Sequence, residues 1–334
     1  MSSSSDCEPF DRNRCSYKDL QDSKDYIQSF IAGKYKPKIG IVCGTGLGSL
    51  ADVLENTLNL PFEDIPHFSV STVAGHVGQL VFGTLSDIDV VCMQGRIHYY
   101  EGYPLWKCVI PIRVMKLLGV EFLIISNAAG GLNENFSVGD VMLIKDHLNL
   151  MAFAGNNPLC GPNDEAEGPR FVVMNQAYDE DLILKAKQIW KHENLDGRLF
   201  DGVYSCVGGP NFETVAEVKM LKLVGVDAVG MSTVHEVLTA RHCGMHVLAF
   251  SIITNICVIN DFEDNSLKHT EVMDVGKMRE DGLKKFIVEM INYIAVNSEW
   301  DYTQLINEEQ REVNGKGCAI ISLIVTPRLY SVPI

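Results

Sequence analysis

The stretch KIGIVCGTGLGSL (38–50) decides the fold class of this chain. Its first part, KIGIVC (38–43), is a nearly continuous apolar run, as expected of a β-strand covered on both faces. Its second part places Gly44, Gly46 and Gly48 between this strand and a helix-like segment. Backbone N–H groups at such a junction can hold an anion, although a tight turn can also require glycine for its conformation alone. The stretch therefore predicts an α/β protein with a candidate phosphate-binding turn.

Similar apolar runs recur along the chain and alternate with helical patterns. The other strand-like runs are QLVFGTL (79–85), DVVCM (89–93), EFLIIS (121–126), DVMLI (140–144), GVYSCV (202–207) and HVLAFSIIT (246–254). Helical patterns cover 104–118, 178–193, 213–224, 234–243 and 270–297. This alternation is typical of α/β architecture. The chain has no internal repeat and no low-complexity linker, which favours a single domain.

Charge and composition exclude several kinds of partner. The chain has 334 residues and a formal net charge of −15, without a dense Lys/Arg run. Nucleic acid and anionic membranes are therefore poor partners, although one local Arg can still hold a small anion. We find no signal peptide and no apolar run long enough to span a membrane, which takes about 18 residues. The ten cysteines are scattered without a CxxC pair, which predicts reduced thiols and a cytoplasmic protein.

Two segments stand apart from the alternating pattern. Residues 154–170, AGNNPLCGPNDEAEGPR, are rich in Gly, Pro and Asn and predict a long loop, of the kind that often carries function. The C-terminal stretch CAIISLIVTPRLYSVPI is apolar and β-prone. An edge strand, a packing arm and an aggregation-prone tail all fit this pattern.

A cluster of chemically active side chains follows the strand-like run 89–93. The stretch GRIHYYEG (95–102) combines Arg96, His98, Tyr100 and Glu101. A core does not need a cation, an imidazole and a carboxylate at the end of a strand. On an acidic chain, this local cation is suited to one small anion.

Three motif-based alternatives are incomplete. The dinucleotide fingerprint G-x-G-x-x-G has Ser49 in place of its third glycine. The serine-hydrolase elbow G-x-S-x-G has Val234 at its last position. A zinc site at His235, His242 and His246 lacks both the H-E-x-x-H spacing and a second Cys/His cluster.

Polar or small residues follow several other predicted strands. They occur in SNAAGGL (126–132), GGPNFETVAE (208–217) and SIITN (251–255). A helix start explains Glu213 and a turn explains Asn255, when each is taken alone. Together they place polar groups at the carboxyl ends of strands, where α/β sheets bind ligands.

The order and spacing of these stretches resemble the trimeric purine nucleoside phosphorylases. The resemblance rests on CGTGLGSL, STVAGHVGQLVFG, MQGRIHYYEGYP, SNAAGGLN, GDVMLIKDHLN, GPNFETVAE, VGMSTVHEV, ITN and HTEV, and covers roughly residues 20–297. It implies a single α/β domain with a mixed central β-sheet or distorted barrel flanked by helices. It places this domain at 20–300, with an N-terminal extension (1–19) and a C-terminal extension of unknown role (301–334). Methylthioadenosine phosphorylases are the next most similar group.

The resemblance implies phosphate-dependent cleavage of purine nucleosides to free base and ribose 1-phosphate. Such a site must hold phosphate, tolerate an oxocarbenium-like ribose and stabilise charge on the departing purine. Inorganic phosphate is then a co-substrate, with no metal and no organic cofactor. The implied phosphate residues are Thr45, Arg96, His98, Asn127, Ala128 and Ser232, with His76 nearby as a gate. We expect Glu101 to orient either the imidazole of His98 or a nearby group of the phosphate site.

The remaining residues implied by the resemblance serve the ribose and the base. Tyr100, Met231 and His269 contact the ribose, and Phe171 of a neighbouring subunit completes the site in a homotrimer. The base-binding residues are Phe212, Glu213, Val229, Gly230, Thr254 and Asn255. The implied catalytic set is His98, Glu213, Asn255 and His269. Ionised Glu213 accepts from N1–H of a 6-oxopurine, whereas adenine has no proton there, so inosine and guanosine are the expected substrates.

Several positions depart from the family pattern. Thr45 replaces a serine, Asn211 replaces a serine and His235 replaces a proline, while Ile256 and Cys257 stand where mammalian members have Lys-Val. These departures leave two alternatives open. One is methylthioadenosine phosphorylase, and the other is a catalytically weak protein that binds nucleosides.

Overall fold

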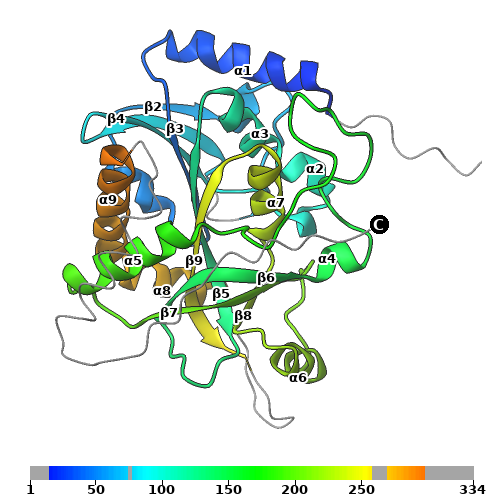
Figure 1. Ribbon diagram of the computed structural model, residues 1–334, viewed down its shortest axis with the longest axis vertical. Coiled ribbons are helices and arrows are strands. Elements are labelled where there is room, and N and C mark those ends of the chain that lie inside the picture. The colour runs from blue at the N-terminus through cyan, green and yellow to red at the C-terminus, as the bar shows by residue number, and fades with distance from the viewer. Residues whose placement is uncertain (1–14, 74–76, 258–268, 298–334) are drawn as a thin grey trace, which may run out of the picture. The chain divides into compact units, whose positions relative to one another are not determined.

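A computed structural model describes residues 15–73, 77–257 and 269–297. The chain divides into two compact units, Met1–Val296 and Asn297–Ile334, and the second lies almost wholly outside the described residues. In the described part of the first unit, nine strands form one sheet in the order β2-β3-β4-β1-β5-β8-β7-β6-β9 (Figure 1). The strands are β1 (Ile39–Cys43), β2 (Glu55–Pro61), β3 (Gln79–Leu85), β4 (Ile88–Gln94), β5 (Phe122–Gly131), β6 (Val141–Asn149), β7 (Leu199–Cys206), β8 (Ala228–Gly230) and β9 (His246–Ile256).

Part of this sheet closes on itself. β5 pairs with β8 over Gly130–Gly131 and also runs parallel to β9 from Phe122 onward, so that β5, β8, β7, β6 and β9 form a ring. The β5–β8 and β6–β9 pairings are antiparallel, and the other three are parallel. This closed mixed barrel confirms the predicted α/β fold with a mixed, distorted barrel.

Helices connect the strands and cover the barrel. The α-helices are α1 (Tyr17–Ile31), α2 (Leu105–Cys108), α3 (Ile110–Leu117), α4 (Leu150–Phe153), α5 (Glu180–His192), α6 (Val215–Leu223), α7 (Val234–His242), α8 (His269–Met278) and α9 (Glu280–Val296). Short 3₁₀ helices are η1 (Gly48–Val53), η2 (Phe62–Asp64) and η3 (Tyr99–Glu101). Within the described ranges, none of the helices has the length and apolar character that crossing a membrane requires.

The core joins the apolar strands to an amphipathic stripe on α9. All residues of β1 are buried, as its continuous apolar run predicts. The buried stripe of α9 includes Leu283, Phe286 and Met290 at helical spacing. The Phe286 ring packs edge-on against both Trp190 of α5 and Phe250 of β9, which holds α9 on the barrel.

The structure corrects several predicted elements. The predicted helix 104–118 is two helices, and a proline in the first turn of α3 accompanies the break. The predicted helix 270–297 is also two helices, divided at Arg279, whose Nε donates to the carbonyl oxygen of Gly139 over 2.8 Å. The sequence interpretation omitted α1, β2 and β8, and α1 begins at Tyr17, before the expected domain start at residue 20.

Candidate active site

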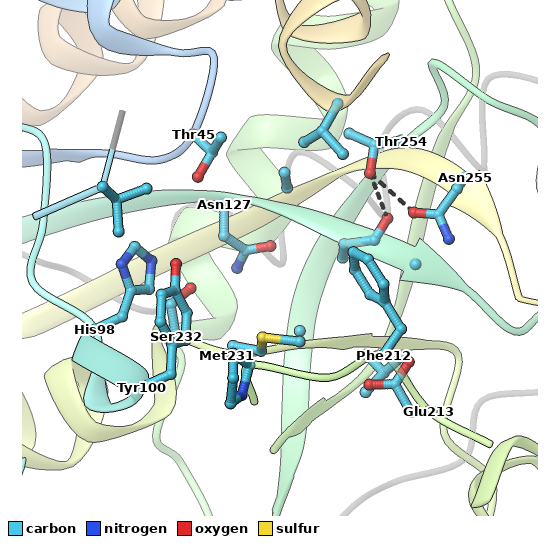
Figure 2. Close-up of a pocket in the computed structure, with 18 of the residues that line it drawn as sticks. Thr45, His98, Tyr100, Asn127, Phe212, Glu213, Met231, Ser232, Thr254 and Asn255 are labelled. Atoms are coloured by element: carbon cyan, nitrogen blue, oxygen red, sulfur yellow. Dashed lines mark hydrogen bonds between the residues drawn. The ribbon is translucent and has the colours of Figure 1, made fainter. Parts of the chain in front are cut away.

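The carboxyl ends of six strands, β1, β4, β5, β7, β8 and β9, and the loops after them converge on one cavity of about 360 Å³ (Figure 2). Loops after β1 and β4 supply Thr45, Arg96, His98 and Tyr100 to its wall. The other predicted residues that line it are Asn127, Ala128, Phe212, Glu213, Val229, Gly230, Met231, Ser232, Thr254 and Asn255. The tertiary structure thus brings together side chains that are more than two hundred residues apart in sequence.

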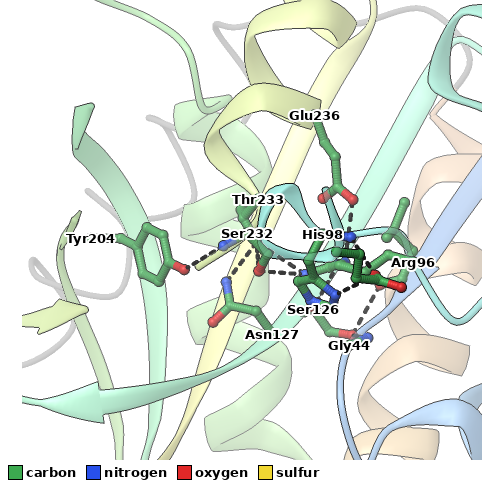
Figure 3. Close-up of polar contacts among 11 residues, drawn as sticks. Gly44, Arg96, His98, Ser126, Asn127, Tyr204, Ser232, Thr233 and Glu236 are labelled. Atoms are coloured by element: carbon green, nitrogen blue, oxygen red, sulfur yellow. Dashed lines mark hydrogen bonds and ion pairs between the residues drawn. The ribbon is translucent and has the colours of Figure 1, made fainter. Parts of the chain in front are cut away.

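Arg96 is a buried cation held by groups from three elements (Figure 3). Its Nη1 donates to Ser232 Oγ over 2.7 Å and its Nη2 donates to the carbonyl oxygen of Ser126 over 2.7 Å. Its Nε lies 3.2 Å from Glu236 Oε1, at an angle that makes this contact an ion pair rather than a hydrogen bond. Burial raises the pKa of the Glu236 carboxyl, and the positive charge of Arg96 opposes this rise.

Glu236 is a buried residue beside the candidate site that the sequence analysis did not single out. It lies in the first turn of α7, one residue after His235. Its side chain is 1% exposed, so its charge requires a partner. Helix α7 (VHEVLTARH) also carries His, Thr and Arg, so no feature of its sequence set Glu236 apart.

The glycine-rich turn packs directly on β5. The N–H of Gly44 donates to Ser126 Oγ over 3.1 Å, and this hydroxyl donates to the carbonyl oxygen of Val42 over 3.0 Å. A Cβ atom at Gly44 would lie 2.7 Å from Asn127 Cα, so only glycine fits. Asn127 Nδ2 in turn donates to Thr233 Oγ1 over 2.8 Å. These contacts fix the turn that carries Thr45, and 3₁₀ helix η1 rather than an α-helix follows it.

His98 is held by Glu101, as the sequence predicted. The backbone N–H of His98 donates to Glu101 Oε1 over 2.7 Å, and its ring Nδ1 lies 3.4 Å from the same oxygen. Glu101 Oε2 accepts from Ser71 Oγ and Thr72 Oγ1. Burial alone would raise the pKa of Glu101, but hydrogen bonds from His98 and Thr72 outweigh it and lower the pKa to about 2. Glu101 is therefore an anion that joins His98 to the 71–72 segment.

Tyr100 lies beside His98 on the same loop. The two rings stack with centroids 4.7 Å apart and an interplanar angle of 12°. Burial, followed by the negative charge of Glu101, raises the pKa of Tyr100 to about 12. Its hydroxyl therefore stays protonated and can donate a hydrogen bond near neutral pH.

The other end of the cavity carries an amide, a carboxylate and an aromatic ring. Thr254 Oγ1 donates to Asn255 Oδ1 over 3.1 Å, which fixes the orientation of this amide. Figure 2 shows the Phe212 ring between Asn255 and Glu213 in this view, with the Glu213 carboxylate directed away from the amide. Burial raises the pKa of Glu213, and the nearby negative charge of Glu217 adds to the rise.

Three predicted site residues are not seen in the cavity wall. Phe171 is 86% exposed on the long loop between α4 and α5. The predictions for His76 and for the side chain of His269 lie outside the described residues. Val272, which follows His269 in the first turn of α8, does line the cavity.

The histidines of the weak zinc motif have separate surroundings. His242 Nε2 lies 3.0 Å from Asn163 Oδ1, and His246 Nδ1 lies 2.7 Å from Asp179 Oδ1. His235 is buried, and its pKa is lowered to about 3 by burial and then by the positive charge of Arg96. In the described part of the chain, the three rings do not gather into a metal-binding group.

Comparison with known proteins points to one family. The profile of the phosphorylase superfamily matches residues 38–292. A purine nucleoside phosphorylase of Anopheles gambiae is 55% identical over 83% of this chain and 78% of its own length.

Solved structures agree with this match. One is a Schistosoma mansoni purine nucleoside phosphorylase in complex with adenosine, with a TM-score of 0.79 and 44% identity over 83% of this chain and 97% of its own. A complex of the Schistosoma mansoni enzyme with inosine has a TM-score of 0.79 and 43% identity over 83% of this chain and 96% of its own.

Proposed function

The chain belongs to the purine nucleoside phosphorylases, and we propose that it cleaves purine nucleosides with inorganic phosphate to a free base and ribose 1-phosphate. The observation that carries this proposal is one cavity with two chemically different ends. One end has a buried guanidinium and hydroxyl groups, and the other has a carboxylate, an amide and an exposed aromatic ring.

Phosphate binds at the end formed by Arg96, Ser232 and Thr45. Arg96 supplies a charge-assisted donor, and Ser232 and Thr45 supply hydroxyls. The ion pair with Glu236 keeps the guanidinium in place before phosphate arrives. Phosphate then adds a second anion on the cavity side of the same cation.

His98 and the backbone complete this phosphate site. Glu101 Oε1 lies 3.4 Å from His98 Nδ1 and helps to orient the imidazole, which lines the cavity. Asn127 and Ala128 line the wall opposite, where small side chains let the anion approach the backbone.

The ribose lies between the two ends, over Tyr100 and Met231. We assign His269, the first residue of α8, to the ribose as well, and the support is that Val272 of the same helix lines the cavity. As the glycosidic bond breaks, the ribose gains positive charge and phosphate lies beside it as the nucleophile. Holding both reactants in one cavity supplies the orientation that the reaction needs.

The purine binds at the end formed by Glu213 and Asn255. Phe212 stacks on the ring, and Val229, Gly230 and Thr254 line the remaining wall. Ionised Glu213 accepts from N1–H, and the Asn255 amide donates to N7, where negative charge develops as the base leaves. Glu213 must turn from the orientation in Figure 2 toward the purine edge.

This arrangement favours 6-oxopurines over adenine. A hydrogen bond to a charged group contributes about 1.5–3 kcal/mol, and adenine forfeits it at N1. Because about 1.4 kcal/mol corresponds to tenfold, inosine and guanosine exceed adenosine by at least about tenfold in kcat/KM. No metal and no organic cofactor take part in the proposed reaction.

Each site is completed by a neighbouring copy in a homotrimer. The support is the position of Phe171, which is 86% exposed on a loop that does not line its own cavity. Exposed Val173 on the same loop extends this apolar surface.

A substrate panel run with and without phosphate tests the proposed function. Inosine and guanosine should yield free base only when phosphate is present, with ribose 1-phosphate as the second product. Inosine cleavage that is unchanged by removing phosphate would refute phosphorolysis. Faster turnover of methylthioadenosine than of inosine would favour the alternative enzyme, and tight inosine binding without turnover would favour a binding protein.

A further inference from the structure

A second cavity of about 250 Å³ adjoins the first and has no role in the proposed reaction. It lies beside α6 and the loop after β7, and Glu213 lines both cavities. A buried site needs only about 10–15 Å³ to hold one water molecule, so this cavity has room for several heavy atoms.

The segment 208–213 contributes residues to both cavities and begins with two glycines. Gly208 and Gly209 line the second cavity, and a Cβ atom at Gly209 would lie 2.3 Å from Sδ of Met231 in the nucleoside cavity. Pro210 and Phe212 of the same segment line the nucleoside cavity, and Asn211 lines the second cavity. Glu213 lines both, so its carboxylate lies at the boundary between them.

The lining of the second cavity suits a short apolar chain that is neutral or positively charged. Leu150, Val207, Met220 and Leu221 supply apolar surface, and Leu221 is 1% exposed. Glu217 adds a carboxylate to that of Glu213, and the described residues that line this cavity include no Lys, Arg or His.

We propose that this second cavity is a subsite for a substituent on the purine 2-amino group, so that the protein cleaves 6-oxopurine nucleosides bearing a short neutral or cationic chain there. The inference rests on the proposed function, which places Glu213 against N1–H and the 2-amino group. When the substituent takes the N2 position on the N1 side, Glu213 keeps the hydrogen bond from N1–H and loses the one from N2, as it does with inosine, and the chain begins beside that carboxylate. The chain then enters the cavity that Glu213 shares.

Four nucleosides test this subsite: guanosine and its N2-butyl, N2-(4-aminobutyl) and N2-(3-carboxypropyl) derivatives. The expected kcat/KM values for the butyl and aminobutyl compounds are within about tenfold of guanosine. The kcat/KM of the carboxypropyl compound should be at least about tenfold lower than that of the aminobutyl compound, because Glu213 and Glu217 repel its carboxylate; tenfold corresponds to about 1.4 kcal/mol.

Three variants link these rates to the second cavity. Met220→Trp should fill it and lower the rates on the butyl and aminobutyl compounds at least about tenfold relative to guanosine. Leu223→Trp is the matched control, because Leu223 lies on the same helix, is 88% exposed and does not line the cavity. Glu217→Gln should narrow the difference in kcat/KM between the aminobutyl and carboxypropyl compounds, because Gln removes the negative charge. Gln still preserves the capping box with Thr214.

Two results would overturn the subsite. One is cleavage of guanosine without cleavage of any substituted compound, and the other is an equal effect of Met220→Trp and Leu223→Trp. Failure to cleave guanosine itself would instead overturn the proposed function, and the inference with it.

Discussion

Replacing Glu236 with Gln removes the charge that balances buried Arg96 while preserving the shape of the side chain. The two charged groups are 3.2 Å apart and each side chain is 1% exposed. At an effective dielectric constant of about 20, Coulomb's law gives about 5 kcal/mol for this separation. Breaking a buried pair by removing one partner costs about 3–5 kcal/mol. Because Gln keeps the shape of the side chain and a polar oxygen beside Arg96, we expect the lower end of this range: Glu236→Gln should lower the free energy of unfolding by about 3 kcal/mol without phosphate.

Phosphate should recover part of this loss, because it places a negative charge beside Arg96 where the variant has lost that of Glu236. A ligand at one hundred times its Kd stabilises the folded state by about 2.7 kcal/mol. A tenfold lower Kd in the variant would add about 1.4 kcal/mol at the same phosphate concentration. Urea unfolding with and without phosphate measures the loss of stability in the variant and the stabilisation by phosphate in each protein. We expect phosphate to raise the free energy of unfolding more in the variant than in the wild type.

An exposed ion pair provides the control. Lys284 Nζ lies 2.6 Å from Glu280 Oε1 on the surface of α9, with side chains 23% and 30% exposed. Glu280→Gln should cost less than about 1 kcal/mol and leave the phosphate effect unchanged. If Glu236→Gln costs no more than this control, or if phosphate stabilises the variant and wild type equally, the assigned role of Glu236 is wrong.

Three further predictions follow from the site. Glu213→Gln should lower kcat/KM for inosine at least about tenfold and abolish the acidic limb of the pH profile of kcat/KM. In the wild type, activity falls as Glu213 is protonated. Because the pKa of Glu213 is raised, this fall should occur at a pH above the usual range for Glu. Glu101→Gln should destabilise the fold most near neutral pH, and the difference from wild type in urea unfolding should shrink between about pH 4.3, the unfolded value, and about 2, the folded value; a constant difference would contradict the assigned ionisation. Gly44→Ala should lower the free energy of unfolding in urea by about 1–3 kcal/mol and raise the KM for phosphate, because the new Cβ meets backbone atoms. Gly282→Ala is the control: this residue lies in open space within α9, so the same urea assay should show no loss or a small gain in stability.

The sequence by itself determined the strands with long apolar runs and most of the longer helices. These elements follow from local pattern, because their periodicity lies within one segment. Helix α1 was missed despite a local signal: Ser16 and Asp19 form a capping box before a stripe of buried Leu20, Ile27 and Ile31. Strand β8 spans only Ala228–Gly230 and is too short for any pattern to identify.

The sequence also contained the residues of the candidate site, through stretches in the order and spacing of one family. Most of them line a single cavity. Glu236 was missed because its importance depends on a buried partner in a distant segment, Arg96.

Only the tertiary structure decided how the sheet closes and what lies behind and beside the site. The pairing of β5 with both β8 and β9 joins segments about a hundred residues apart, and no local periodicity encodes that contact. The second cavity beside Glu213 arises in the same way, from the packing of α6 against the loop after β7. Local sequence specifies elements, whereas barrel closure, buried charge pairs and shared cavity walls depend on contacts that exist only in the folded chain.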